Sequence, residues 1–282
     1  MILPRRRRAA IFAEIASDLC TALYFDPEIS STGIEKLSTG IAAEDALCNC
    51  LAGVKPGKLD FYALLPLQAV TFSSLDITAS FKKKNAKAFI ETNSGYFDKS
   101  NTAICYDFWF SGKQDTEKLN IATISSNEIE SVYCLAEKFD IRPVCVTIAE
   151  LVIANALRMQ INYVLVLSRG SGSAVLYMQH NRLAHSRFIK HKPVNMEDGD
   201  VLVGPIIEEL NLIRNVSELD NLQVLFFSER QELNDKLFKE LQREDGFTLV
   251  TLGSVLPTCP EQINKNIGGL ACYLMAKIGA GI

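Results

Sequence analysis

Two neighbouring stretches decide the fold of this chain. Residues 119–157 read LNIATISSNEIESVYCLAEKFDIRPVCVTIAELVIANAL, and residues 163–189 read YVLVLSRGSGSAVLYMQHNRLAHSRFI. The apolar patterns in the first stretch predict a strand, a helix, a strand and a helix, at 119–124, 126–139, 144–148 and 149–158. The second stretch predicts three strands joined by a glycine-containing turn and a hairpin turn, at 163–167, 174–178 and 183–189.

The order of elements on either side suggests a duplication. The N-terminal part begins with two strand-like runs and continues with helices and strands, at 9–15, 19–25, 42–54, 61–65, 70–75, 78–92 and 103–110. The C-terminal part continues as helix, strand, helix, strand and helix, at 201–214, 222–227, 231–243, 247–252 and 263–278. Each half therefore opens with a hairpin or meander and goes on with alternating helices and strands. This order predicts an α/β fold of two lobes, 1–118 and 119–282, with a duplicated core.

Composition places the chain among ordinary globular proteins. Of its 282 residues 48% are hydrophobic and 22% are charged, and 29 basic against 33 acidic residues give a net charge of −4. This balance excludes intrinsic disorder and argues against a nucleic-acid partner. No run reaches the roughly 20 apolar residues of a membrane-spanning helix. The start MILPRRRR lacks an apolar core, so we do not expect a signal peptide.

Cysteine and histidine spacings do not predict a metal site. The closest cysteines are Cys48 and Cys50, which is not the spacing of a zinc or redox motif. The eight cysteines are expected to be buried free thiols. Three histidines follow one another within a dozen residues, His180, His185 and His191, and we expect them at a surface or in a hairpin. The carboxylate pairs Glu128 with Glu130 and Glu208 with Glu209 are expected on solvated helix faces.

The segment pattern resembles a family of cytoplasmic scaffold proteins. In actin-like proteins of the PilM type, the cytoplasmic domain of GspL, BfpC and MshI, a helix precedes a Gly-Leu-x-Pro-x-x-Val strand. Here Phe139-Asp140-Ile141-Arg142-Pro143-Val144 holds that place, and the helix that contains 266–271 resembles their closing helix. The resemblance covers about residue 119 to the end. It implies an actin-like α/β fold of two lobes, with duplicated mixed sheets flanked by helices.

The nucleotide-binding elements that the actin-like fold carries in ATPases are altered here. The first phosphate hairpin should read like Asp-Ile-Gly-Ser-Ser, but the chain has Glu14-Ile15-Ala16-Ser17-Asp18, without the glycine that allows close approach to a phosphate. The second should read Asp-x-Gly, but Ser168 replaces the carboxylate that Mg²⁺ prefers. Ser228-Glu229-Arg230 stands where the adenosine site usually has a Gly-Gly pair. The resemblance therefore implies a pseudo-ATPase.

From this we expect a non-catalytic scaffold without cofactor or metal. The resemblance implies that it links the cytoplasmic assembly or secretion ATPase to inner-membrane platform proteins of a type IV pilus or a type II secretion system. It also implies a location at the cytoplasmic face of the bacterial inner membrane, with a homodimer as a further possibility. Affinity for such partners would come from strand addition or from docking in a groove.

Two alternatives stay open. One is an actin-like or sugar-kinase-like ATP-binding enzyme that uses Asp18 and the loop around Gly170. Its candidate nucleotide-binding residues are Ser168, Gly170, Ser171, Gly172 and Ser173. The same loop is also explained as a simple hairpin turn, because it does not open a helix. The other alternative is a regulatory sensor that uses the altered cleft for another ligand.

Two basic runs are candidates for interaction. Arg5–Arg8 would give a weak, salt-sensitive attraction to an anionic membrane, or would merely keep the N-terminus soluble. The lysines of 82–87 form the basic side of the helix predicted at 78–92. They indicate either a solvated helix face or a patch for an acidic partner or an anionic lipid.

Overall fold

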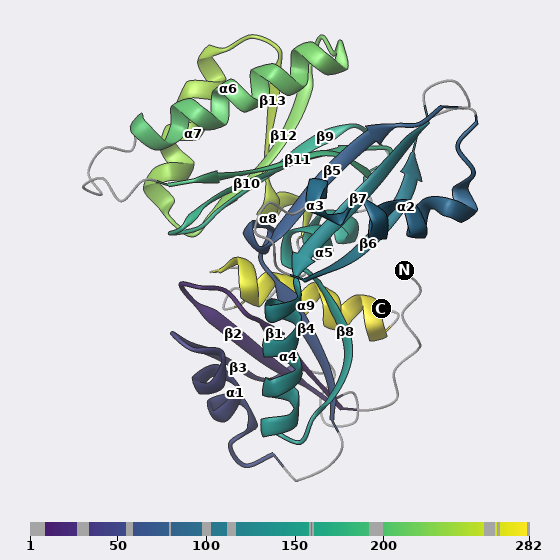
Figure 1. The fold of residues 1–282 in the computed structure, drawn as a ribbon. Helices are drawn as coiled ribbons and strands as arrows, with labels where there is room; N and C mark the ends of the chain where they lie inside the picture. Colours follow the sequence, from purple (N-terminus) through teal and green to yellow (C-terminus); the bar gives the residue numbers. More distant parts are fainter. Residues whose placement is uncertain are drawn as a thin grey trace. The chain divides into compact units, whose positions relative to one another are not determined.

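The computed structural model describes residues 9–26, 34–54, 59–78, 80–97, 103–111, 117–157, 159, 161–191, 200–256, 263 and 266–280. The chain forms two compact units (Figure 1). Unit 1 comprises Met1–Leu67 and Ile141–Ile282, and unit 2 comprises Gln68–Asp140. The Arg5–Arg8 run and Cys259 lie outside the described residues. The division into lobes at residues 118 and 119 stays a prediction.

The first sheet of unit 1 has the strand order β3-β2-β1-β4-β8. Its strands are β1 (Ala10–Glu14), β2 (Cys20–Phe25), β3 (Ile34–Gly40), β4 (Asp60–Leu65) and β8 (Arg142–Ile148). The first three form an antiparallel meander, whereas β4 runs parallel to β1 and β8 runs parallel to β4. Every residue of β1, β2 and β4 is buried, which agrees with their nearly continuous apolar sequences.

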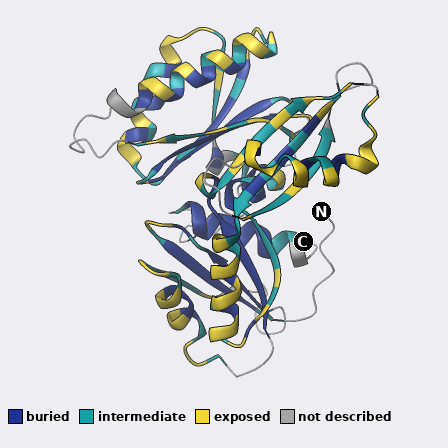
Figure 2. Cartoon of the chain, in the orientation of Figure 1, coloured by how far each residue is buried: buried dark blue, intermediate teal, exposed yellow. Residues whose placement is uncertain are grey.

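The second sheet of unit 1 repeats this arrangement. Its strands are β9 (Tyr163–Ser168), β10 (Gly172–Gln179), β11 (Arg182–Lys190), β12 (Leu222–Ser228) and β13 (Phe247–Thr251). The order is β11-β10-β9-β12-β13, again with an antiparallel meander followed by two parallel strands. Figure 2 shows the central strands of both sheets in dark blue, as buried residues. The duplication expected from the order of elements is therefore present in the sheets of unit 1.

A pair of helices connects the two sheets. α5 (Ala149–Leu157) packs on α9 (Ile267–Ala280). α9 also contacts β1 and β2, and α5 contacts β8 of the first sheet and β10 of the second. Both helices are mostly apolar, as expected for helices enclosed between sheets. Within the described part of the chain, no helix is long and apolar enough to cross a membrane.

The outer helices of unit 1 bury one side each. α1 (Ala43–Leu51) contacts β2 and β3. α6 (Asp200–Ser217), α7 (Gln231–Arg243) and the short α8 (Leu252–Val255) accompany the second sheet. In α7 the residues Leu233, Leu237 and Leu241 are buried at a spacing of four, which places them on one helix face. They belong to the same apolar core as Val224 and Phe226 of β12.

Unit 2 is built on a three-stranded antiparallel sheet of order β5-β7-β6. Its elements are η1 (Leu67–Ala69), β5 (Val70–Asp76), η2 (Lys83–Asn85), α2 (Ala86–Thr92), α3 (Ser94–Phe97), β6 (Ile104–Ser111), β7 (Lys118–Ser125) and α4 (Ser126–Lys138). Leu119 and Ile121 of β7 pack with Ile90 and Phe97 of α2 and α3. The Ser125 hydroxyl accepts the Asn127 N–H, so Ser125 caps α4, one residue before the start of the predicted helix.

Two differences from the sequence-based prediction have a clear physical reason. No strand is predicted at residues 34–40, yet β3 lies there as an edge strand with exposed Lys36 and Thr39. Edge strands often carry polar residues, and the apolar pattern that marks a strand is then weak. The helix predicted at 78–92 is shorter, because the Phe81 N–H donates to the Thr78 carbonyl in a turn and α2 begins only at Ala86.

Candidate functional site

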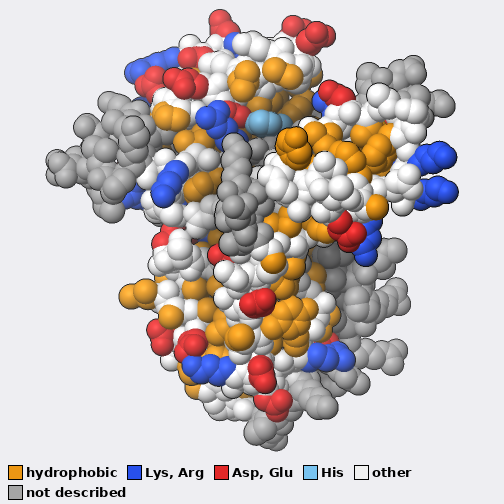
Figure 3. Space-filling model, viewed as in Figure 1, with side chains coloured by type: hydrophobic (Ala, Val, Ile, Leu, Met, Phe, Trp, Pro, Cys, Tyr) orange, Lys and Arg blue, Asp and Glu red, His pale blue; other side chains and the backbone are white. Residues whose placement is uncertain are grey.

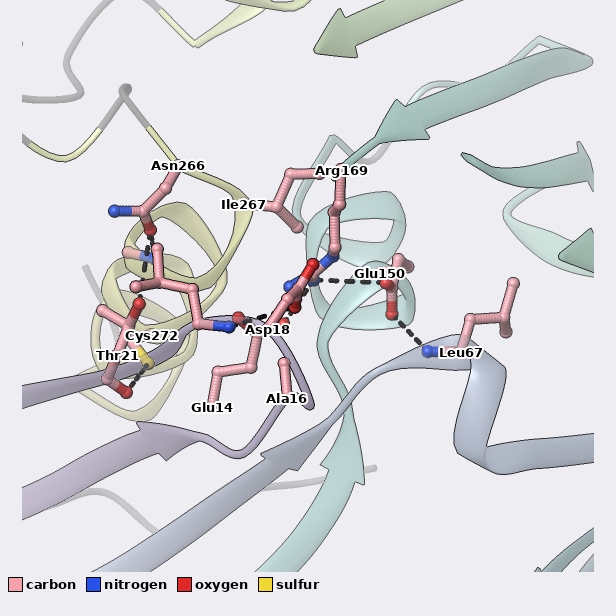
Figure 4. Close-up of polar contacts among 12 residues, drawn as sticks. Glu14, Ala16, Asp18, Thr21, Leu67, Glu150, Arg169, Asn266, Ile267 and Cys272 are labelled. Carbon is pink, nitrogen blue, oxygen red and sulfur yellow. Dashed lines mark hydrogen bonds and ion pairs between the residues drawn. The ribbon is translucent and has the colours of Figure 1, made fainter. Parts of the chain in front are cut away.

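The candidate site lies where the parallel strands of the two sheets in unit 1 end. Glu14 is the last residue of β1, and Glu150 lies two residues after β8, in the first turn of α5. Arg169 directly follows β9, and Glu229 directly follows β12. Side chains that follow parallel strands gather at one edge of a sheet, which is the usual place of ligand sites in α/β folds. Figure 4 shows Glu14, Glu150 and Arg169 converging from β1, α5 and the β9–β10 turn.

Arg169 pairs with two buried carboxylates. Its Nη2 atom donates to Glu14 Oε1 and lies 3.2 Å from Glu150 Oε1. The side chain of Arg169 is 5% exposed, and those of both glutamates are 1% exposed. Glu150 also accepts the Leu67 N–H at 2.9 Å. A buried charge is tolerated only when it is paired and hydrogen-bonded. Removing any of these three charged side chains would therefore weaken the pairing of the others.

Acidic groups outnumber the central cation. Burial raises the pKa of Glu14 to about 7, although Arg169 acts in the opposite direction. Burial also raises the pKa of Glu229, whose carboxylate accepts the Ile267 N–H at 2.9 Å at the start of α9. Burial alone would lower the pKa of Arg169, but Glu14 and Glu150 outweigh it and raise that pKa. Arg169 is therefore charged, and Glu14 carries a proton in part of the molecules at neutral pH.

Helix α9 closes one side of this cluster. A Cβ atom on Gly268 would lie 2.1 Å from Glu14 Oε2 and 2.8 Å from Thr21 Oγ1, so only glycine lets the helix approach β1 and β2 this closely. Asn266 accepts hydrogen bonds from the Thr21 hydroxyl and the Gly269 N–H. The Cys272 thiol donates to the Thr21 carbonyl at 3.8 Å.

The β9–β10 turn contains the five candidate nucleotide-binding residues. The Arg169 N–H donates to the Gly172 carbonyl at 2.8 Å and closes the turn. The hydroxyls of Ser168 and Ser173 are 2.8 Å apart, and both residues are buried. A Cβ on Gly172 would lie 2.4 Å from Phe188 Cζ, so this glycine permits the packing of β10 on β11. At Gly170 a Cβ would meet only Asp18 Oδ2, at 3.6 Å.

His191, which directly follows β11, contacts the same turn, and the sequence does not indicate this contact. Its Nε2 atom is 2.9 Å from the Ser173 hydroxyl, and its backbone N–H donates to the Ser171 carbonyl at 3.1 Å. Burial lowers the pKa of His191 and favours the neutral ring. Because Ser173 is fully buried, this serine–histidine pair holds the turn and offers no accessible nucleophile.

A nucleoside triphosphate with its metal ion does not fit these residues. The gap between the two hairpin turns is small, since Asp18 on the first turn is within van der Waals distance of a Cβ at Gly170 on the second. The cation at this place is Arg169, and it is already neutralised by Glu14 and Glu150. Added phosphates would face the same carboxylates. Across the described residues, no group of three or more His, Cys, Asp or Glu side chains could hold a metal ion.

Two other predictions need correction. Glu209 was expected on a solvated helix face, but it is buried and pairs with His185 Nε2 at 2.6 Å and with Arg187 of β11. Its neighbour Glu208 is exposed, as expected. The cysteines are not uniformly buried, because the free thiols of Cys48 and Cys134 are exposed. In both cases a helix turns neighbouring residues toward opposite environments, which the composition of the segment does not reveal.

Comparison with known proteins gives matches in structure alone. No protein-family profile and no curated protein sequence matches the chain. It is similar to a chain of the PilM–PilN type IV pilus biogenesis complex, with a TM-score of 0.66, 10% identity, and coverage of 98% of this chain and 99% of that one. It is also similar to the cytoplasmic domain of EpsL, an inner-membrane component of the type II secretion system of Vibrio cholerae, with a TM-score of 0.53, 10% identity, and coverage of 78% and 82%.

A third similar structure is a Bacteroides thetaiotaomicron protein with an actin-like ATPase fold and unknown function. Its TM-score is 0.52 at 10% identity, with coverage of 90% of this chain and 97% of that one. At such low identities the likeness concerns the fold. The fold is thus actin-like, and the predicted α/β architecture with duplicated mixed sheets flanked by helices is confirmed, as is the resemblance to PilM and GspL-type structures at the level of fold.

Proposed function

We propose that this chain is a non-catalytic scaffold in the inner-membrane assembly complex of a type IV pilus or a type II secretion system. The observation that carries the proposal is the cluster of Arg169 with Glu14 and Glu150. It lies between the two hairpin turns where an actin-like ATPase would hold its nucleotide. With these side chains in the place of the nucleotide, the chain acts in this proposal by binding other proteins through its surface.

The likeness to a chain of the PilM–PilN complex supports a partner of the membrane platform type. In this proposal the chain binds such a platform protein, and also the cytoplasmic assembly or secretion ATPase, at the cytoplasmic face of the inner membrane. Edge strands offer one means of attachment, because β3 and β11 each leave one side unpaired by the described strands of their sheets. Self-association into a homodimer belongs to the same proposal.

The test is recruitment to the membrane by a partner. An epitope-tagged chain is expressed in cells with and without the genes of the pilus or secretion platform, and membrane and soluble fractions are compared. We expect the chain in the membrane fraction only when the platform protein is present, and co-purification of that protein after mild detergent extraction. A soluble pool of the same size in both strains, with no platform protein co-purifying, contradicts the scaffold function.

An exposed-residue variant is the control for this assay. Arg243→Met on α7 removes one partner of the ion pair with Glu240 and leaves Arg169, Glu14 and Glu150 unchanged. It should enter the membrane fraction to the same extent as the unaltered chain when the platform protein is present.

A further inference from the structure

Unit 2 carries an open groove beside α2, with a volume of about 660 Å³. Phe81, Ala88 and Phe89 supply its apolar part, and the rings of Phe81 and Phe89 meet edge to face with centroids 5.7 Å apart. Thr78 and Asn85 add polar groups along the rim. This volume is in the range of sites that hold a few side chains of a ligand.

The groove has a basic rim. Residues 78–97 contain four lysines and one acidic residue, Glu91. Lys83 pairs with Glu117, and Lys87 lies 3.8 Å from Glu91. Lys82 lines the groove, and both it and Lys84 are exposed and form no ion pair with any described residue. Figure 3 shows basic side chains gathered at the outer edge of this unit, next to apolar surface.

The shape favours a peptide over a membrane. Proteins that lie on membranes bury protruding apolar side chains among the lipids. Here Phe81 and Phe89 are only partly exposed and lie within a depression, with polar groups along its rim. An extended peptide can place one side chain into such a depression and leave its flanking residues beside the lysines.

We propose that this groove binds an acidic segment of a partner protein. One apolar side chain of the segment packs against Phe81 and Phe89. The carboxylates of its neighbouring acidic residues face Lys82 and Lys84. The proposal names a surface and a partner chemistry for the scaffold, and it rests on the proposed function only for the partner's place in the cell. The chain as a whole carries a net charge of −4, so the attraction for an acidic peptide comes from the local basic rim and not from the overall charge.

The test is selection from a random peptide display library on the intact purified chain. We expect enriched peptides that combine Asp or Glu with Phe, Leu or Trp, and these are then synthesised and their Kd measured by fluorescence anisotropy. The double variant Lys82→Glu with Lys84→Glu should raise the Kd about tenfold or more at low salt. Ala88→Trp, which fills the groove from an exposed position, should abolish binding.

The control is the double variant Lys190→Glu with Lys239→Glu, which makes the same change of net charge at exposed positions in unit 1. It should leave the Kd within about twofold of the unaltered chain, and all variants should keep the same thermal midpoint. Selection without an acidic preference, no selected peptide at all, or a Kd insensitive to Ala88→Trp overturns the proposal. Binding of phosphatidylglycerol vesicles through Lys82 and Lys84, without peptide binding, assigns the surface to the membrane and also overturns it. Because this assay needs no cells, its failure is distinct from a failure of membrane recruitment.

Discussion

The two sheets of unit 1 have the same strand order and directions, but the turns of their first hairpins carry side chains of opposite charge. In the first sheet the turn between β1 and β2 brings acidic residues, Glu14 before the turn and Asp18 within it. In the second sheet the turn between β9 and β10 brings the cation Arg169. The strands of both hairpins are almost entirely buried, so the difference is confined to the turns and their ends.

The two halves therefore share the architecture of their core and differ in the charged residues of their turns. Glu14 comes from the first sheet and Arg169 from the second, so their ion pair joins the two halves directly. Glu150 adds a second carboxylate from α5, the helix that contacts both sheets. The protein thus forms from its own side chains an ion-pair bridge between its two halves.

The strongest way to break this bridge is to remove its cation. Arg169→Met leaves Glu14 and Glu150 buried without a cation, and we expect the free energy of unfolding to fall by about 3–5 kcal/mol. Urea denaturation followed by circular dichroism measures this change. Adding Glu14→Gln and Glu150→Gln to Arg169→Met removes the unpaired charges and should recover most of the loss.

The matched control is Arg243→Met on α7, which removes one partner of an exposed ion pair and should change the free energy of unfolding by less than about 0.5 kcal/mol. Equal effects of Arg169→Met and Arg243→Met would show that the buried cluster does not join the halves.

The acidic side of the bridge should make stability depend on pH. The pKa of Glu14 is about 7 in the folded protein and near its ordinary value of 4.5 in the unfolded chain, because burial disfavours its charged form. Between these values the folded state holds a proton that the unfolded state has lost, so stability falls as pH rises from about 4.5 to 7. The loss from this group is up to about 3 kcal/mol.

Glu14→Gln removes this titration while it keeps a side chain of similar size. Comparing urea midpoints of the two proteins at several pH values isolates the contribution of Glu14 from that of Glu229, whose pKa is raised by burial as well. The difference between the two curves of urea midpoint against pH should change between about pH 4.5 and 7 and level off above pH 7. Parallel curves would contradict the assigned role of Glu14.

Glycine-to-alanine variants test where close packing requires the absence of a Cβ atom. Gly172→Ala and Gly268→Ala would place a Cβ within 2.4 Å of Phe188 and 2.1 Å of Glu14, and each should reduce stability by about 1–3 kcal/mol. Gly170→Ala meets only ordinary contact and should be nearly neutral. Gly204→Ala in α6 has open space and should stabilise by up to about 1 kcal/mol. Thermal melts of the four variants give this order, and a large loss of stability in Gly170→Ala would contradict the space found at this turn.

The sequence predicts the fold better than the site. Long apolar strands such as β4 and β9, and amphipathic helices such as α7, have strong periodic signals and lie where the pattern places them. The edge strand β3 has a weaker pattern and is missed. The absence of glycine at Ala16 and of a carboxylate at Ser168 is visible in the sequence and indicates a changed nucleotide site.

The cluster of Arg169 with Glu14 and Glu150 is not visible in the sequence. Arg169 and Glu14 are 155 positions apart, and their pairing follows from how the two sheets meet. A charged residue at the end of an apolar strand or directly after it is the signal that could have pointed to the cluster, since Glu14, Arg169 and Glu229 all occupy such places. The role of Gly268 requires knowledge of the distance between α9 and β1, which no local pattern contains.

Isothermal titration of the purified chain with ATP and Mg²⁺ tests the central claim most directly. If Arg169 and its two carboxylates stand in the place of the nucleotide, no binding heat should appear up to millimolar ATP, and no phosphate should be released over hours. Micromolar binding accompanied by hydrolysis would contradict the account and would favour an actin-like ATPase that uses Asp18 and the turn around Gly170.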